Sequence, residues 1–410
     1  MSEPRLDDQQ HRESYGILLP ILVVTMTASS YQIFALSVLA VDIIDDIGVS
    51  RTGLGLLGSL NTMVGALSAP MMGRLTDRIG AKEATVAILA ISGLGMGMMA
   101  LSGSWLLMGL SAIISGIPQG WGNPATNALI AERIDGSRRG TVTGIKQSGV
   151  QLGIFLAGLT LPGLALLIGW RGALMGYAIF YAVGAVVVAK SLGQPTQAAL
   201  NARSANNQRT DSPALPSFIW LLSIYAFLFG AAGGAIGRFF PLWANEEVGL
   251  STVVAGILVA LGGLLGIGAR IGAGQLAQSR IAPRRMLMIQ ALIGVVYCVL
   301  LILTLQVGAW ILWPATILYA LGIGSWNAVA MLAVIVSVPQ AVAGRASGIV
   351  MLGFLGGLAI SSPLAGAAVD RWDTYQPVWI VATVLSLASA ALITISLDRH
   401  VERTAPAGLT

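Results

Sequence analysis

Twelve long apolar runs dominate this sequence, and each is long enough to cross a membrane. A bilayer core requires about 20 apolar residues per helix. Only 10% of the 410 residues are charged, whereas a soluble domain carries about 25%. Because backbone groups in hydrocarbon must satisfy one another, the runs are predicted to be α-helices. They cover residues 16–40, 53–72, 84–102, 105–130, 140–161, 172–189, 217–240, 253–277, 286–305, 310–336, 346–369 and 377–397.

The two halves of the sequence repeat each other. At an offset of 201 residues, Ser50, Gly55, Leu57, Gly65 and Gly73 align with Ser251, Gly256, Leu258, Gly266 and Gly274; at 204, Asn123, Gly144, Gly149 and Gly153 align with Asn327, Gly348, Gly353 and Gly357. Residues 191–216, between the halves, have the polar composition of a solvated linker. We therefore predict an all-α integral membrane protein with two pseudo-symmetric six-helix bundles, residues 1–190 and 217–410, joined by a cytoplasmic linker.

The distribution of basic residues predicts how the chain sits in the membrane. Seventeen Lys and Arg fall on one side of the predicted spans and three on the other. The positive-inside rule then puts both termini in the cytoplasm of a multi-pass cytoplasmic-membrane protein. The first fifteen residues are polar and precede a spanning run, so no cleavable signal peptide is expected. The dispersed basic residues do not suggest nucleic acid as a partner, and we expect a monomer.

Few residues could support enzymatic or metal chemistry. Both histidines, His11 and His400, lie in the terminal tails, and Cys298 is the one cysteine. No phosphate-binding loop of the Gly-x-x-x-x-Gly-Lys-Ser/Thr type is present. We therefore expect no catalytic residues, no cofactor and no metal site, which argues against a membrane enzyme and against ATP-driven transport.

Three cations, Lys146, Arg238 and Arg270, lie inside predicted spans, and no acidic residue does. A cation at the bilayer centre costs about 3 kcal/mol or more, so it usually faces a cavity or a partner. An electropositive interior without acids favours an anionic ligand. The repeat-equivalent positions are uncharged, which marks the three cations as candidates for substrate binding.

Each cation also has a structural interpretation. Lys146 lies seven residues beyond Arg139, about 10 Å along a helix, and could extend back to the interface. Arg270 could have a structural role near the same interface. Arg238 is equally compatible with a gate salt bridge to one of three acids near the opposite interface: Asp42, Glu246 or Glu247.

A charged turn at residues 73–82 separates the second and third runs. It contains Gly73, Asp77, Arg78, Gly80 and Lys82, and a degraded copy recurs from Gly274, with Gln278 and Ser279 where an acid would be expected. This Gly-x-Leu-x-Asp-Arg-x-Gly-x-Lys pattern resembles the most diagnostic loop of the major facilitator superfamily, and the resemblance covers essentially the whole chain. It implies a conformational motif, with Asp77 facing the start of the eleventh helix near residues 344–347.

Two cations add a weaker resemblance to particular branches of that superfamily. Lys146 within residues 140–153, and Arg270 four residues before Gly274, resemble the cyanate-transporter-like and monocarboxylate-transporter-like branches. The sequence departs from the wider pattern at Ser111 and Ala112, where many members have an arginine. It also has Gly266 where monocarboxylate carriers place an acid, so proton coupling by that route is not expected.

In the superfamily, helices 1, 4, 7 and 10 line the central cavity. The resemblance therefore nominates the polar and aromatic residues of these helices, and i, i+4 spacing beside Lys146 adds two glutamines of the fifth helix. Asn123 and Asn327 are repeat-equivalent, so interhelical hydrogen bonds are an alternative role for both. The candidates are Tyr31, Phe34, Trp121, Asn123, Asn127, Tyr225, Trp326, Asn327, Gln147 and Gln151.

These features together predict a secondary active transporter for a small organic anion, a carboxylate, working by rocker-switch alternating access. Lys146 and Arg270 would bind the anion from opposite halves. The alternative is an efflux transporter for drugs or metabolites. A co-transported proton is a further expected partner, with Asp42 as its candidate site and a solvated helix end as the other interpretation of Asp42.

Overall fold

A computed structural model describes residues 6–134, 138–193, 215–338 and 340–404. Within these residues the chain is helical and forms no strand. The helices of the first half are α1 (Leu6–Val38), α2 (Ala40–Ile47), α3 (Arg51–Ile79), α4 (Ala81–Ala100), α5 (Trp105–Arg133) and α6 (Arg139–Ser191). Those of the second half are α8 (Ser217–Glu246), α9 (Thr252–Ser279), α10 (Pro283–Val307), η1 (Ala309–Ile311), α11 (Leu312–Leu321), α12 (Trp326–Ser337), α13 (Gln340–Trp372) and α14 (Gln376–Thr404).

The described helices make twelve membrane crossings, which confirms the predicted number. Ten segments are long and apolar enough to span a bilayer. One of them, α6, contains two crossings because Gly169 (φ 73°) turns the chain in its middle. Helix α5 adds the twelfth. Its 29 residues are long enough to span a bilayer, although they are less apolar than those of the ten segments. η1, α11 and α12 together make a single crossing.

Four local features differ from the sequence-based expectation. Residues 162–168, predicted as part of a loop, continue α6. The short helix α2 was not predicted, and α1 begins within the segment expected to be a polar tail. The tenth predicted span, 310–336, is interrupted at residues 322–325, between α11 and α12. Most of the predicted linker, residues 194–214, lies outside the described residues.

The sequence repeat has a counterpart in the helix starts. Ser50 caps α3, where its side chain accepts a hydrogen bond from the backbone N–H of Gly53. Ser251, at the repeat-equivalent position, caps α9 by accepting from Val254. A serine at the N-cap satisfies one of the free N–H groups of a first helical turn, so the repeat preserves where each helix enters the membrane.

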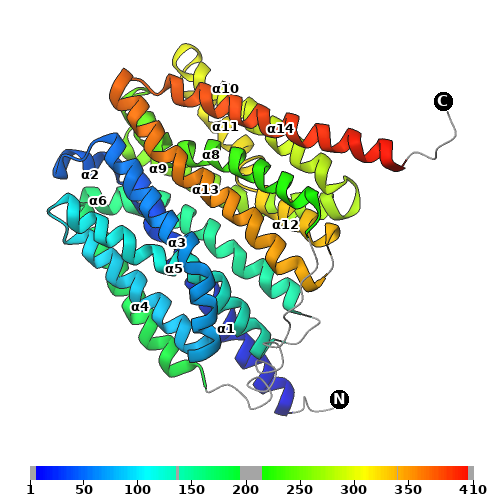
Figure 1. Cartoon of the computed structure of the whole chain (residues 1–410). Helices are drawn as coiled ribbons and strands as arrows, with labels where there is room; N and C mark the ends of the chain where they lie inside the picture. The colour runs from blue at the N-terminus through cyan, green and yellow to red at the C-terminus, as the bar shows by residue number, and fades with distance from the viewer. Residues whose placement is uncertain (1–5, 135–137, 194–214, 339, 405–410) are drawn as a thin grey trace, which may run out of the picture.

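The two halves pack face to face along three helix pairs, α1 with α8, α3 with α13 and α6 with α9. Figure 1 shows the blue helix α3 beside the orange helix α13. Glycines allow the close approach: a Cβ at Gly55 of α3 would overlap the backbone carbonyl of Ser362 in α13. We call the end of the bundle where α3 begins the Arg51 end, and the opposite end, with residues 73–82, the turn end.

Candidate functional site

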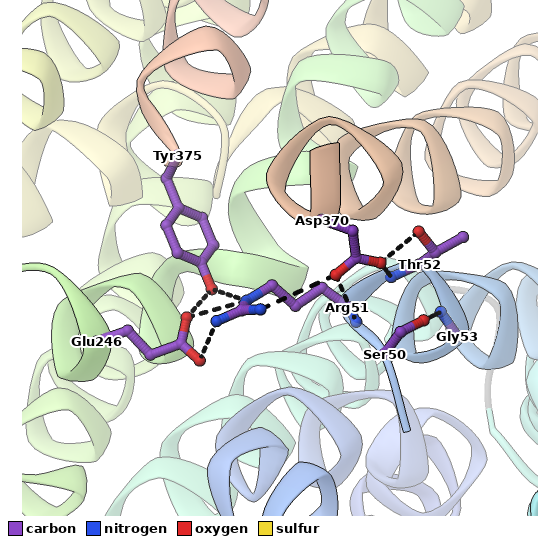
Figure 2. Close-up of polar contacts among 7 residues, drawn as sticks. All are labelled: Ser50, Arg51, Thr52, Gly53, Glu246, Asp370 and Tyr375. Carbon is purple, nitrogen blue, oxygen red and sulfur yellow. Dashed lines mark hydrogen bonds and ion pairs between the residues drawn. The ribbon is translucent and has the colours of Figure 1, made fainter. Parts of the chain in front are cut away.

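A polar network closes the Arg51 end between the two halves. The Arg51 guanidinium forms an ion pair with Glu246 of α8 (2.9 Å) and lies 3.9 Å from Asp370 of α13. Figure 2 shows that it also donates to the Tyr375 hydroxyl, which in turn donates to Glu246. Burial, together with the hydrogen bond to Glu246, raises the pKa of Tyr375, so this hydroxyl stays a donor. One first-half cation thus holds three groups of the second half.

Backbone and hydroxyl contacts extend this closure along α3 and α13. The Asp370 carboxylate accepts hydrogen bonds from the backbone N–H groups of Arg51 (3.1 Å) and Thr52 (2.8 Å), as drawn in Figure 2. These are free N–H groups at a helix N-terminus, where a carboxylate is favourable. Further along, the Ser59 hydroxyl donates to the carbonyl of Ala359. The two halves are therefore closed against each other at this end.

A cavity of about 610 Å³ lies between the halves. Its lining runs from Ser37 and Arg238, on the side of the Arg51 end, to Ala69 and Ser347, on the side of the turn end. Two arginines, Arg238 and Arg270, line it, and no Asp or Glu does among the described residues. The cavity is therefore electropositive, as the sequence predicted for the interior. Its apolar lining includes Met26, Ile33, Phe34, Val38, Phe240, Leu258 and Phe354.

Arg270 is fixed in this cavity by the interruption between α11 and α12. Its Nε donates to the carbonyl of Gly324 (2.9 Å), a group that the break frees from helical hydrogen bonding. The Gln151 amide of α6 donates to the same carbonyl (3.1 Å). A guanidinium presents five N–H donors in a fixed fork. With Nε occupied, the Nη atoms are the groups that Arg270 can offer to an anion.

Lys146 is wholly buried (0% exposed) and does not line the cavity. Its ammonium does not extend to the interface but donates to three oxygens of α5: Asn127 Oδ1 (2.6 Å), Thr126 Oγ1 (2.9 Å) and Asn123 Oδ1 (3.2 Å). Three acceptors match the three N–H groups of an ammonium. Lys146 is thus covered by the two asparagines, which are exposed and line the cavity.

Arg238 is 5% exposed and wedged between the halves. Its Nη1 donates to the carbonyl of Ile33 in α1 (3.1 Å), and its guanidinium fills the space that a Cβ would take at Gly58 of α3. No salt bridge of Arg238 to Asp42, Glu246 or Glu247 is formed between described residues. The gate salt bridge considered for Arg238 is made instead by Arg51, one of the three cations on the cation-poor side of the predicted spans.

The remaining candidates divide between the cavity and the protein core. Tyr31 lies away from the cavity, stacked on Tyr177 with ring centroids 4.4 Å apart. Trp326 packs on Phe354, and Asn327 donates to the sulfur of Met351. Trp121 and Tyr225 are buried and donate to Thr76 and to the carbonyl of Leu287. The predicted residues that line the cavity are Phe34, Asn123, Asn127, Gln147, Gln151, Arg238, Arg270, Trp326 and Asn327.

The 73–82 turn lies away from the cavity. Helix α3 ends at Ile79, and Gly80 joins it to α4 with a φ of 104°, a conformation that favours glycine. Asp77 and Arg78 are exposed. The expected partner of Asp77, at residues 344–347, falls partly among side chains outside the described residues, so that contact stays a prediction.

Sequence reasoning missed the gate residues Arg51, Asp370 and Tyr375. All three flank predicted spans, where polar side chains are expected to be solvated, and their side-chain partners in the gate lie at least 129 residues away. One signal was available: Arg51 is one of three cations on the cation-poor side of the spans. The break at residues 322–325 was also missed, because its two glycines do not stand out among 51.

Comparison with known proteins places this architecture among transporters. A family model described as Major Facilitator Superfamily matches residues 21–358. A hexuronate transporter of Bacillus subtilis is 25% identical over 57% of each chain, and a probable nitrate/nitrite transporter of Mycobacterium tuberculosis is 29% identical over 59% of this chain and 61% of its own. The matched region thus spans little more than half of these two relatives. A multidrug resistance protein of Dickeya zeae is 25% identical over 85% of both chains.

Solved structures share the fold. The inward-facing, unoccupied crystal structure of a bacterial homolog to the human lysosomal transporter Spinster superposes with a TM-score of 0.75. The two chains are 15% identical, and the match covers 96% of this chain and 97% of that one. At this identity the likeness concerns the arrangement of helices alone.

Proposed function

The chain belongs to the Major Facilitator Superfamily, and from this premise we propose that it is a secondary active transporter for a small organic anion, a carboxylate. The observation that carries the proposal is the charge of the cavity, which is lined by Arg238 and Arg270 and by no acidic residue among the described ones. Charge-assisted hydrogen bonds from a guanidinium to a carboxylate are among the strongest polar contacts available to a protein. The hexuronate and nitrate/nitrite relatives are both named for anions, and the first for a carboxylate, which supports an anionic substrate.

In this proposal the Nη atoms of Arg270 bind the carboxylate. Arg238 is released when the Arg51 end opens, because its present contacts with Ile33 and Gly58 both cross between the halves. Transport then proceeds by rocker-switch alternating access, with each end of the cavity opening in turn. The bias of seventeen cations to three supports an orientation with the turn end and both termini in the cytoplasm, and we propose a cytoplasmic-membrane protein that works as a monomer. The present conformation would then be closed to the outside.

Uptake into proteoliposomes tests this function. Radiolabelled glucuronate, lactate and nitrate would be compared with tetraphenylphosphonium, a lipophilic cation. We expect uptake of glucuronate or lactate and none of the cation. Arg270→Lys should reduce anion uptake at least about tenfold, because a lysine cannot hold the Gly324 carbonyl and present a fork at the same time. Arg280→Lys is the matched control, because Arg280 is exposed and lies at the end of the same helix, α9, away from the cavity. Uptake of the cation alone would refute the proposal.

Efflux of drugs or metabolites is the second candidate function. The multidrug resistance relative matches over 85% of both chains, and much of the cavity lining is apolar. A growth-inhibition panel in an overexpressing strain separates the two functions. Resistance to several unrelated compounds, without uptake of any anion in proteoliposomes, would favour efflux.

Proton coupling is a separate part of the proposal. Asp42, in the short helix α2 at the Arg51 end, is the candidate acid, and burial raises its pKa, with a smaller contribution from Asp45. If Asp42 carries the coupled proton, a pH jump across the liposome membrane should drive accumulation in the native protein and not in Asp42→Asn. Equal accumulation in both proteins would exclude Asp42 from coupling.

A further inference from the structure

Among the described side chains of the first half, Lys146 is the one fully buried cation, and it forms no ion pair with a described acid. Every oxygen that it contacts belongs to α5, and two of the three are side-chain amide oxygens, those of Asn123 and Asn127. The third, the Thr126 hydroxyl, uses its own hydrogen on the carbonyl of Gly122 (2.6 Å) and therefore accepts from Lys146. The ammonium is fully occupied by these three oxygens, so a cavity ligand has no direct access to it.

The chemistry of the ammonium fixes how both asparagines are turned. An ammonium has donors only, so each amide must direct its oxygen toward Lys146. Gln147 reinforces this orientation at Asn123, where its Nε2 donates to the same Oδ1 (3.0 Å). The NH₂ group of each amide then points away from Lys146. Both asparagines are exposed and line the cavity, and neither Nδ2 has a hydrogen-bond partner among the described residues.

The free donor of Asn123 lies at the depth of Arg270 on the opposite half, and that of Asn127 lies about one helical turn nearer the turn end. Helices α5 and α9 both begin at the Arg51 end, and Asn123 and Arg270 each lie 18 residues past the first residue of their helix. At 1.5 Å per residue, both are about 27 Å from that end. The cavity near this level therefore has a guanidinium on one side and amide NH₂ groups on the other, all of them donors.

The internal repeat shows that the scaffold does not require this arrangement. Asn327 occupies the position of Asn123 in the second half and donates to Met351, which occupies the position of Gln147. The contact between the two helices is kept, but Val350 stands where the first half has Lys146. The lysine and its two asparagine contacts are thus specific to the first half.

We infer that Lys146 is a positioning residue, whose ammonium holds the amide oxygens of Asn123 and Asn127 so that both NH₂ groups act as donors to the oxygens of an organic anion bound at Arg270. This inference rests on the proposed function for the anion. It replaces direct binding by Lys146, which the sequence suggested, with binding through neutral amides. A substrate with a second oxygen-bearing group, such as a hydroxylated carboxylate, fits donors on both sides of the cavity.

Equilibrium binding of radiolabelled glucuronate to the purified protein in detergent tests the inference separately from transport. We expect Asn123→Ala, Asn127→Ala and Lys146→Met each to weaken binding at least about tenfold, the loss expected when a hydrogen bond to a charged group is removed. Adding Lys146→Met to the double asparagine variant should cause no further loss, because the lysine acts only through those amides. Lys190→Met, an exposed lysine at the end of α6, is the matched control and should bind normally.

Amine labelling adds a measurement that needs no ligand. The chain has three lysines, Lys82, Lys146 and Lys190. Reductive methylation followed by mass spectrometry should modify Lys190 and spare Lys146 in the native protein, and should modify Lys146 once both asparagines are alanine. A full additional loss from Lys146→Met in the double variant, which means direct contact, would overturn the inference. Unchanged glucuronate binding in the asparagine variants would overturn it as well. Absence of glucuronate binding to the native protein would also overturn it. Binding without uptake in proteoliposomes would instead contradict only the proposed transport function.

Discussion

Arg51 connects the two halves through its guanidinium and its backbone N–H. Its guanidinium contacts Glu246 and Tyr375, its backbone N–H binds Asp370, and all three partners belong to the second half. The Arg51 and Glu246 side chains are 27% and 25% exposed, so their attraction is partly screened by solvent. The network is therefore suited to a reversible gate rather than to a permanent lock.

Replacing Arg51 should shift the conformational equilibrium without unfolding the protein. For Arg51→Gln we expect the closed state to be destabilised by about 1 kcal/mol relative to the open state, which makes the open population roughly five times larger. Distances between spin labels at Asp45→Cys and Arg371→Cys, one exposed position in each half at this end, would report it in a Cys298→Ser background. Arg171→Gln is the control, because Arg171 pairs with Asp46 inside the first half. Equal distance distributions in Arg51→Gln and native protein would contradict this role.

Asp42 should make stability depend on pH. Burial, with a smaller effect of Asp45, raises its pKa in the folded protein. A raised folded pKa means that the group's contribution to stability is present below its unfolded pKa, about 3.9, and is lost as pH rises through the folded value. Asp42→Asn should therefore melt at a higher temperature than native protein at pH 7, and the two should converge near pH 4. A melting difference that does not change with pH would show that the Asp42 charge is not responsible.

At the scale of elements, the contact between α3 and α13 is set by glycines. A Cβ at Gly55 would overlap the carbonyl of Ser362, and one at Gly366 would overlap the carbonyl of Arg51. Because both obstacles are backbone atoms, the helices would have to move apart. The closed Arg51 end thus depends on the small size of these residues as much as on the polar gate.

Gly55→Ala and Gly366→Ala should accordingly hold the Arg51 end open. If the closed state is destabilised by about 1.4 kcal/mol or more, the rate of uptake should fall at least about tenfold, while expression and melting temperature change little. Gly109→Ala, in α5, is the control, since a Cβ there would meet nothing within 4 Å. Native rates of uptake in both gate variants would show that α3 and α13 need not pack this closely during transport.

The elements also show what sequence can and cannot predict. Each membrane crossing requires a long apolar run, so the spans were predictable from one sequence, and the serines that cap α3 and α9 followed the 201-residue repeat. The interruption before Trp326 was not predictable, because it depends on tertiary partners: the freed Gly324 carbonyl is satisfied by Arg270 and Gln151. The burial of Lys146 likewise depends on α5 covering it.

For the whole molecule, function requires the two halves to separate at one end while they meet at the other. The present structure has the Arg51 end closed by contacts from three helix pairs, among them Ser37 of α1 with the carbonyl of Gly237 in α8 (2.6 Å). A cavity lined by residues of both halves cannot exchange its contents at that end until these contacts break. Opening must therefore separate apolar as well as polar contacts, since one buried core includes residues of both halves.

A covalent bridge across the Arg51 end should therefore stop transport. Thr52 and Asp370 lie in hydrogen-bond contact (2.6 Å), so a Thr52→Cys/Asp370→Cys pair in the Cys298→Ser background is within reach of a short, reducible thiol cross-linker. We expect uptake into proteoliposomes to cease on cross-linking and to return after reduction, since only separation of the halves is blocked. An Asp46→Cys/Arg171→Cys pair joins two elements of the first half at the same end, so cross-linking this control should leave uptake unchanged. Continued uptake by the cross-linked Thr52–Asp370 protein would mean that the halves do not separate at the Arg51 end during transport.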